Sequence, residues 1–303
     1  MAPAPIYYLS PHADDVAFSC AGSVALDVAA GHPVTLITAF LSGAEAALRR
    51  KEDEAAAAAL GCSYRCLELP DAPDRPEIRG ALGVFMPLGP QHLGIINEVV
   101  TRLLWHVTAA EQLHIRAPLA VGGHIDHRLV HEAARALAYH LGRSAQLTYY
   151  EDQPYSLTRY SLGRRIQALR PRPPIEVERA APPVEQAAYR ASVAAWPLAQ
   201  RWLPGLRQLN CHLIARRAVS TDAELQRPGF PPLLRAWLRP LDAPAVLERR
   251  RQAIAAHQSQ WPLFAPSLEA FVEQLDLYGR RYGDGGPPCE RLWHDEGVHG
   301  PAA

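Results

Sequence analysis

Two short stretches of the sequence carry side chains that can bind a metal ion and catalyse hydrolysis. The first is residues 10–15, with the sequence SPHADD, and the second is residues 122–127, with the sequence GGHIDH. Together they contain three histidines and three aspartates. A catalytic zinc site uses three nitrogen or oxygen ligands and leaves one position open for water. The two stretches therefore contain the residue types that metal-assisted hydrolysis of an amide requires.

The ligand set that these stretches favour is His12, Asp15 and His127. Two imidazoles and one carboxylate suit zinc or another borderline divalent ion. We expect one Zn²⁺ per chain, and the residues leave open whether the ion is Zn²⁺ or Fe²⁺. Asp14 is left over beside this set, and we expect it to act as general base toward water.

The second stretch also contains a candidate for stabilising negative charge on the substrate. Asp126 can hydrogen-bond one ring nitrogen of His124 and favour its imidazolium form. The other nitrogen of His124 would then face the site as an oxyanion stabiliser or as a proton donor to a leaving amine. We also expect Asp126 to be the N-cap of the helix that follows.

Both stretches follow predicted strands. Strands are predicted over residues 5–9, 34–40 and 65–69, alternating with helices over 20–30 and 46–60. This alternation is typical of a parallel sheet with right-handed crossovers. Ligands bind such sheets beyond the carboxyl ends of the strands, so the sheet would bring the two stretches together. Further along the chain, we predict strands over 118–121 and 146–150 and helices over 97–110 and 127–141.

The predicted fold class is α/β, a Rossmann-like and mostly parallel sheet with helices on both faces and a helical C-terminal extension. Residues 1–158 would form the core, and residues 159–303 a mainly helical extension packed on the core as one structural unit. In the extension we predict helical structure over 185–247, 247–260 and 268–282, and irregular structure over 283–303.

The composition excludes several classes of protein. The chain has 31 basic and 31 acidic residues, so there is no electrostatic case for a nucleic-acid partner. No apolar stretch approaches the roughly 18 residues of a membrane span, and no signal peptide is recognisable. The five cysteines complete no zinc site and are interpreted as reduced thiols. We therefore expect a cytoplasmic protein with a small-molecule substrate.

The two stretches resemble the His-Pro-Asp-Asp-Glu and His-Pro-Asp-His signatures of the PIG-L/LmbE-like superfamily of zinc-dependent N-deacetylases. The resemblance implies a Rossmann-like fold and the removal of an acetyl group from an N-acetylglucosamine derivative in glycolipid, thiol-cofactor or antibiotic pathways. It also implies His12, Asp15 and His127 as zinc ligands, Asp14 as the base, and His124 as oxyanion partner or acid. In this family pattern, Asp126 would orient His124.

The resemblance extends to other positions and has departures. Ala13 and Ile125 replace the usual prolines, and Val16 replaces the usual glutamate. None of these three is a proposed ligand or base. Four residues in matching segments are candidates for contacts to the substrate, and each could instead be an exposed residue without such a role: Arg50, Asp71, Glu151 and Asp152.

The predicted activity is therefore removal of an N-acetyl or other N-acyl group from an amino sugar or a glycosylated small metabolite. One alternative is a deacylase of a non-sugar natural-product intermediate. A second is a non-catalytic protein that keeps the metal site. A third, a nucleotide-binding protein, is disfavoured because no G-x-G-x-x-G sequence follows the first strand.

Overall fold

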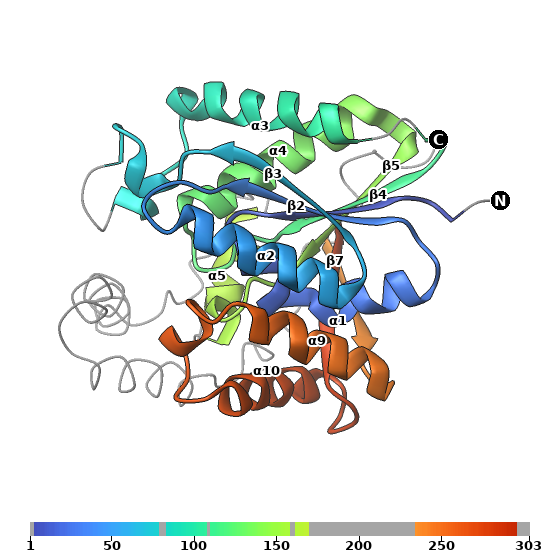
Figure 1. Ribbon diagram of the computed structural model, residues 1–303. Coiled ribbons are helices and arrows are strands. Elements are labelled where there is room, and N and C mark those ends of the chain that lie inside the picture. Colours follow the sequence, from blue (N-terminus) through green and yellow to red (C-terminus); the bar gives the residue numbers. More distant parts are fainter. Residues whose placement is uncertain (1–2, 79–82, 108–109, 158–160, 170–233, 296–303) are drawn as a thin grey trace.

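The described residues form a seven-stranded sheet with the strand order β3-β2-β1-β4-β5-β7-β6 (Figure 1). A computed structural model describes residues 3–78, 83–107, 110–157, 161–169 and 234–295. The first five strands in this order pair in parallel, whereas β7 pairs antiparallel with both β5 and β6. The strands are β1 (Ile6–Ser10), β2 (Val34–Phe40), β3 (Ser63–Leu69), β4 (Leu113–Pro118), β5 (Ala145–Tyr150), β6 (Leu234–Pro240) and β7 (Cys289–Asp295).

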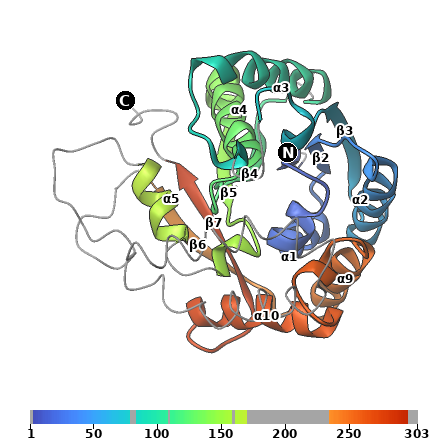
Figure 2. The ribbon, with the colours of Figure 1, turned by 90° about the vertical axis from the view of Figure 1, so that its left-hand side faces the viewer.

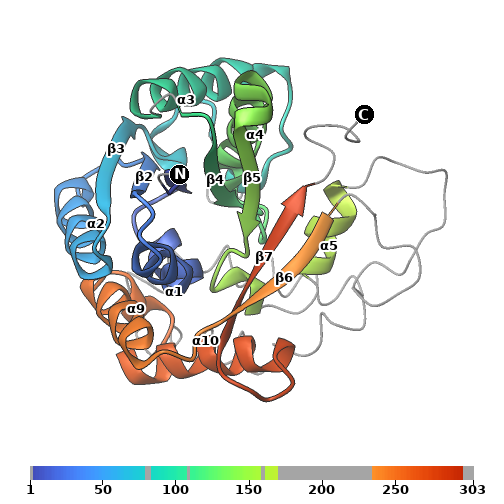
Figure 3. The ribbon, with the colours of Figure 1, turned by 90° about the vertical axis from the view of Figure 1, so that its right-hand side faces the viewer.

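Helices cover both faces of the sheet, as Figures 2 and 3 show. Helices α3 and α4 pack on one face, and α1, α2 and α9 pack on the other. Alternate side chains of β1 enter the two cores: Tyr7 and Leu9 face α3 and α4, whereas Ile6 and Tyr8 face α1. The helices are α1 (Asp15–Ala29), α2 (Ala46–Leu60), α3 (Leu93–His106), α4 (Ile125–Leu141), α5 (Ser161–Leu169), α9 (Pro244–Ala256) and α10 (Leu268–Tyr282).

The prediction of an α/β fold with a mostly parallel sheet is confirmed. The strand predicted over 34–40 is β2, and the helix predicted over 46–60 is α2. Gly61 ends α2 in the left-handed conformation, with φ of 78°, which glycine adopts without the steric cost of a Cβ. No helix in the described ranges is long and apolar enough to cross a membrane.

Two predicted boundaries near the candidate stretches are wrong. The helix predicted from residue 20 begins at Asp15, and a local break at Cys20 (φ −152°) divides it. The strand predicted over 118–121 ends at Pro118, so the residues after it form a loop before α4. Arg116 concealed this strand in the sequence, because its charge interrupts the apolar pattern. In the fold its guanidinium lies 3.0 Å from the carboxylate of buried Asp27.

The C-terminal part of the chain adds two strands to the sheet, which corrects the prediction of its secondary structure. Residues 234–240, predicted to be helical, form β6, and residues 289–295, predicted to be irregular, form β7. A seven-residue run cannot be assigned to strand or helix by periodicity alone, and the two strands pair only with distant segments. The rest of the predicted helical stretch, residues 185–233, lies outside the described residues, and the division at residue 158 stays a prediction.

A buried carboxylate joins β7 to α1 at the break in that helix. Glu290 accepts hydrogen bonds from the backbone amides of Gly22 (2.9 Å) and Ser23 (2.5 Å). These amides lie just after Cys20, where the non-helical backbone interrupts the regular bonding of the helix. The C-terminal strand therefore supplies acceptors that α1 itself lacks.

We predict that Glu290→Ala lowers the free energy of unfolding by about 2–4 kcal/mol, because each unpaired buried amide costs about 1–3 kcal/mol. Chemical denaturation monitored by circular dichroism measures this change. The matched control is Glu273→Ala in α10, where the glutamate is exposed and the expected change is within about 0.5 kcal/mol. Equal stability of the two variants would contradict the anchoring role of Glu290.

Candidate metal and catalytic centre

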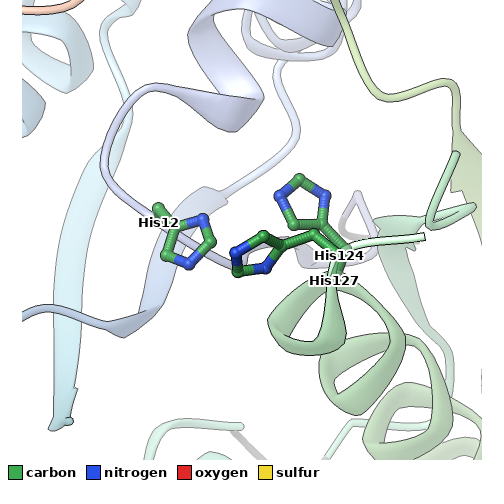
Figure 4. Close-up of side chains that lie close together, drawn as sticks. All are labelled: His12, His124 and His127. Atoms are coloured by element: carbon green, nitrogen blue, oxygen red, sulfur yellow. The ribbon is translucent and has the colours of Figure 1, made fainter. Parts of the chain in front are cut away.

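The two candidate stretches meet at the carboxyl ends of β1 and β4, which are neighbours in the sheet. His12 lies in the loop after β1, and His124 and His127 lie at the start of α4 (Figure 4). One ring nitrogen from each of these three histidines lies within 4.8 Å of the other two. His127 is fully buried, and His12 and His124 are half-buried.

Asp15 lies between two of these histidines. Its Oδ2 is 3.3 Å from Nδ1 of His12 and 3.4 Å from Nε2 of His127. Ligand atoms around a tetrahedral zinc ion, with bonds of about 2.0–2.2 Å, are about 3.3–3.6 Å apart. Nε2 of His127 is also buried without a hydrogen-bond partner. The donor set of His12, Asp15 and His127 therefore fits a divalent metal ion.

Two further carboxylates orient the histidine rings from behind. Asp152 lies 2.5 Å from Nδ1 of His127, and Asp126 lies 2.9 Å from Nε2 of His12. Each carboxylate favours a proton on the ring nitrogen that it contacts, and this leaves the lone pair on the other nitrogen. In metal sites such carboxylates fix both the tautomer and the direction of the ligand.

The electrostatics of this centre favour positive charge. Burial acts to lower the pKa of His12, but hydrogen bonds with Asp126 and Asp15 raise it well above its ordinary value. Burial acts to raise the pKa of Asp15, but His127 and His12 together lower it to about 2. The carboxylate of Asp15 is thus kept ionised, which is the form that attracts a cation.

The position of Asp126 differs from the expectation that its carboxylate orients His124. That carboxylate is occupied by His12, by the guanidinium of Arg75 and by the backbone amide of Ala72 (3.0 Å). Only the backbone amide of Asp126 contacts His124, donating to its Nδ1 at 3.2 Å. The N-cap of α4 is therefore His124, where Asp126 was predicted.

This cap determines which proton His124 carries. Because Nδ1 accepts a hydrogen bond from a backbone amide, the neutral ring holds its proton on Nε2. Burial lowers the pKa of His124 to about 3, and His12 contributes in the same direction. His124 is thus a neutral hydrogen-bond donor, and the imidazolium form that was expected from the sequence is disfavoured.

Asp14 lies beside the metal-binding set in a strained conformation. Its φ is 108°, which is unusual for any residue except glycine. Its Oδ2 lies 3.6 Å from Nη2 of Arg49. Burial raises the pKa of Asp14 to about 8, and Arg49 opposes this effect. Strained residues that the surrounding structure holds in place are concentrated at functional sites.

The four residues considered for substrate contacts take different positions. Arg50 pairs at 2.8 Å with the exposed carboxylate of Glu68 and belongs to the outer surface of α2. Asp71 is half-buried near the centre, with Oδ2 3.9 Å from Arg49 Nη1, and stays a candidate for a substrate contact. Asp152 supports His127, so its carboxylate is engaged within the protein.

Glu151 serves the C-terminal strand. Its carboxylate accepts hydrogen bonds from Tyr278 Oη and Trp293 Nε1, both at 2.7 Å, and it pairs with Arg291. With 3% of its surface exposed, Glu151 has no capacity left for a substrate. We therefore assign it to the packing of β7 and α10 against β5.

Arg49, Asp53 and Arg75 are close to the centre and were not identified from the sequence. A pattern in α2 could have indicated the first two, because Arg49, Asp53 and Ala56 share one helix face at spacings of four and three residues. Ala56 is fully buried, so that face points inward and Arg50 points outward. Arg75 lies in an irregular loop, where no periodicity exists to indicate its direction.

Part of the chain is similar in sequence to known proteins. Residues 7–138 match the sequence model of the PIG-L family, described as GlcNAc-PI de-N-acetylase. A curated relative, 2'-N-acetylparomamine deacetylase from Streptomyces fradiae, is 36% identical over 170 residues. That alignment covers 49% of this chain and 56% of the relative, so this chain spans little more than half the length of the curated relative it matches.

Solved structures share the fold over nearly the whole chain. A deacetylase–bog complex from the biosynthesis pathway of teicoplanin has a TM-score of 0.64 at 18% identity, covering 95% of this chain and 96% of the other. The zinc-inhibited form of teicoplanin deacetylase has a TM-score of 0.63 at 17% identity, covering 95% and 97%. At these identities the similarity establishes the architecture.

We predict that Asp152→Ala weakens zinc binding by about 10–100-fold, because His127 loses the carboxylate that sets its tautomer and direction. Competition with a chromogenic zinc chelator at constant pH measures the affinity. Glu132→Ala is the control, since Glu132 lies on the same helix as His127 and forms an ion pair with Arg135. If Asp152→Ala binds zinc with wild-type affinity, His127 in the orientation set by Asp152 is excluded as a zinc ligand.

Proposed function

We propose that this chain, whose residues 7–138 match the PIG-L family model, is a metal-dependent hydrolase. It would remove an N-acetyl or other N-acyl group from an amino sugar or a glycosylated small metabolite. One observation carries the proposal: the carboxylate of Asp15 lies between the ring nitrogens of His12 and His127, at separations suited to a tetrahedral ion. Asp14 and His124 stand beside this set with the chemistry that amide hydrolysis needs.

The ion that we propose is one Zn²⁺ held by His12, Asp15 and His127, although Fe²⁺ also suits two imidazoles and a carboxylate. Such an ion, when bound, polarises an amide carbonyl and makes water acidic enough to attack near neutral pH. The zinc-inhibited form of a structural neighbour supports zinc as an ion that this architecture accepts. The protein orients the ligands through Asp126 and Asp152.

Asp14 and His124 would move and hold the protons of the reaction. Asp14 would take a proton on a carboxylate oxygen from the attacking water and pass it to the nitrogen of the leaving amine. His124, with its proton on Nε2, would donate a hydrogen bond to the carbonyl oxygen as negative charge develops there. Arg49 would keep the carboxylate of Asp14 in place, because its guanidinium contacts it directly.

The substrate class rests on the relatives. The curated relative acts, by its name, on 2'-N-acetylparomamine, and the structural neighbours belong to teicoplanin biosynthesis. An acylated amino sugar carried on a small natural product is therefore the class that we propose. A cytoplasmic location and the lack of a nucleic-acid partner stay predictions from the composition.

We predict that Asp14→Asn retains the metal and lowers kcat by about 10²–10⁴-fold, the usual contribution of a general base.

His124→Ala should lower kcat by about 10²–10³-fold, as expected for one oxyanion donor. Elemental mass spectrometry measures the metal, and fluorescamine detection of the released amine measures turnover on N-acetylated aminoglycoside fragments.

Arg50→Ala is the control for both variants, since Arg50 points away from the centre and kcat and KM should be unchanged. Near wild-type turnover by Asp14→Asn would remove Asp14 as the base. A metal-loaded wild type that releases no amine from any acylated amino sugar would leave a metal-binding protein without the proposed activity.

A further inference from the structure

The backbone of Asp14 needs an external restraint. A non-glycine residue with φ of 108° stores about 1–3 kcal/mol of strain, and it persists only when surrounding contacts hold it. On its C-terminal side, the carbonyl of Asp14 accepts a bond from the amide of Phe18 in the first turn of α1. That bond fixes the start of the helix and leaves the peptide group before Asp14 to be held by something else.

Two side chains of α2 hold that peptide group from opposite ends. Nη2 of Arg49 donates to the carbonyl oxygen of Ala13 at 2.7 Å. The amide of Asp14, which belongs to the same peptide group, interacts with the carboxylate of Asp53 and lowers its pKa against the effect of burial. Arg49 and Asp53 are four residues apart in α2 and therefore lie on one face of the helix. The orientation of this peptide plane determines φ of Asp14.

Asp53 is itself fixed in direction. Its Oδ2 accepts a hydrogen bond from the Thr38 hydroxyl of β2 at 2.5 Å, and only 2% of its surface is exposed. Its Oδ1 lies 3.7 Å from Nε2 of His257, a fully buried histidine from the segment after α9. A strand, a helix and the C-terminal segment thus meet at this carboxylate.

We propose that Asp53, together with Arg49, is a positioning residue that holds the Ala13–Asp14 peptide group and so aims the carboxylate of Asp14 at the reacting water. This inference rests on the proposed hydrolase function, in which Asp14 is the base. Asp53 makes no contact with substrate and acts only through the backbone of Asp14. A displacement of a catalytic group by about 1 Å can cost about 10²-fold in rate, so this indirect role has a measurable effect.

The test compares Asp53→Leu with Asp53→Asn. Leucine removes both acceptor oxygens, whereas asparagine keeps one oxygen for the Asp14 amide and an NH₂ group for the Thr38 hydroxyl. Asp53→Leu should lower kcat by about 10²-fold, with KM within about threefold and zinc content unchanged. Asp53→Asn should keep kcat within about threefold of the wild type. Glu54→Leu, at the exposed neighbouring position of α2, is the matched control and should leave kcat unchanged.

Hydrogen exchange of the Asp14 amide, followed by NMR, gives a readout that is independent of activity. Exchange should be faster in Asp53→Leu and close to wild type in Asp53→Asn. Thr38→Val removes only the hydroxyl that directs Asp53, so it should accelerate hydrogen exchange of the Asp14 amide. This variant replaces Asp53→Leu in the test if Asp53→Leu does not fold.

Wild-type kcat in metal-loaded Asp53→Leu would overturn the inference, as would unchanged exchange of the Asp14 amide in that variant. A uniform loss of thermal stability with kcat retained would assign Asp53 to the fold alone and would also overturn it. If the wild type releases no amine, the proposed function fails, and the exchange of the Asp14 amide still decides whether Asp53 positions that residue.

Discussion

The site depends on the parallel pairing of β1 with β4. This pairing brings the carboxyl ends of two strands to the same edge, so that residues 114 positions apart, His12 and Asp126, come within 2.9 Å. A shift of the register by one residue would displace one stretch by about 3.3 Å relative to the other. That displacement is about as large as the 3.4 Å separation between Asp15 and His127, which come from different stretches, so the donor set would no longer converge.

Around this edge, buried carboxylates are matched with cations and imidazoles. Removing an unpaired charge from water costs several kcal/mol, and a partner must offset that cost. Asp126 has His12 and Arg75, and Asp152 has His127. Burial acts to raise the pKa of Asp126, but its hydrogen bond with His12 holds that pKa well below the ordinary range. The carboxylate of Asp126 therefore stays ionised, and Asp126 and Asp152 each direct one histidine ring.

The C-terminal segment contributes to the support of this centre, although the proposed ligands come from the N-terminal half. The hydroxyl and the amide of Ser259 both donate to Glu52 of α2, at 2.6 Å and 2.7 Å, next to Asp53. His257 lies against Asp53. Its ring packs edge-on against the ring of Phe18 in α1, with 5.6 Å between the ring centroids. Helix α2 thus contacts both the loop after β1, through Arg49, and the segment that follows α9.

The sequence by itself determined the α/β architecture of the first half and the two stretches that form the centre, because strand periodicity and residue chemistry are local properties. Only the tertiary structure decided which partner each of the polar groups takes. Asp126 pairs with His12 where His124 was expected, Arg49 faces inward where Arg50 was expected, and residues 289–295 extend the sheet. Neighbouring side chains on a helix differ by about 100° in direction, and strand partners are distant in sequence. These outcomes therefore depend on packing between elements, which a local pattern does not contain.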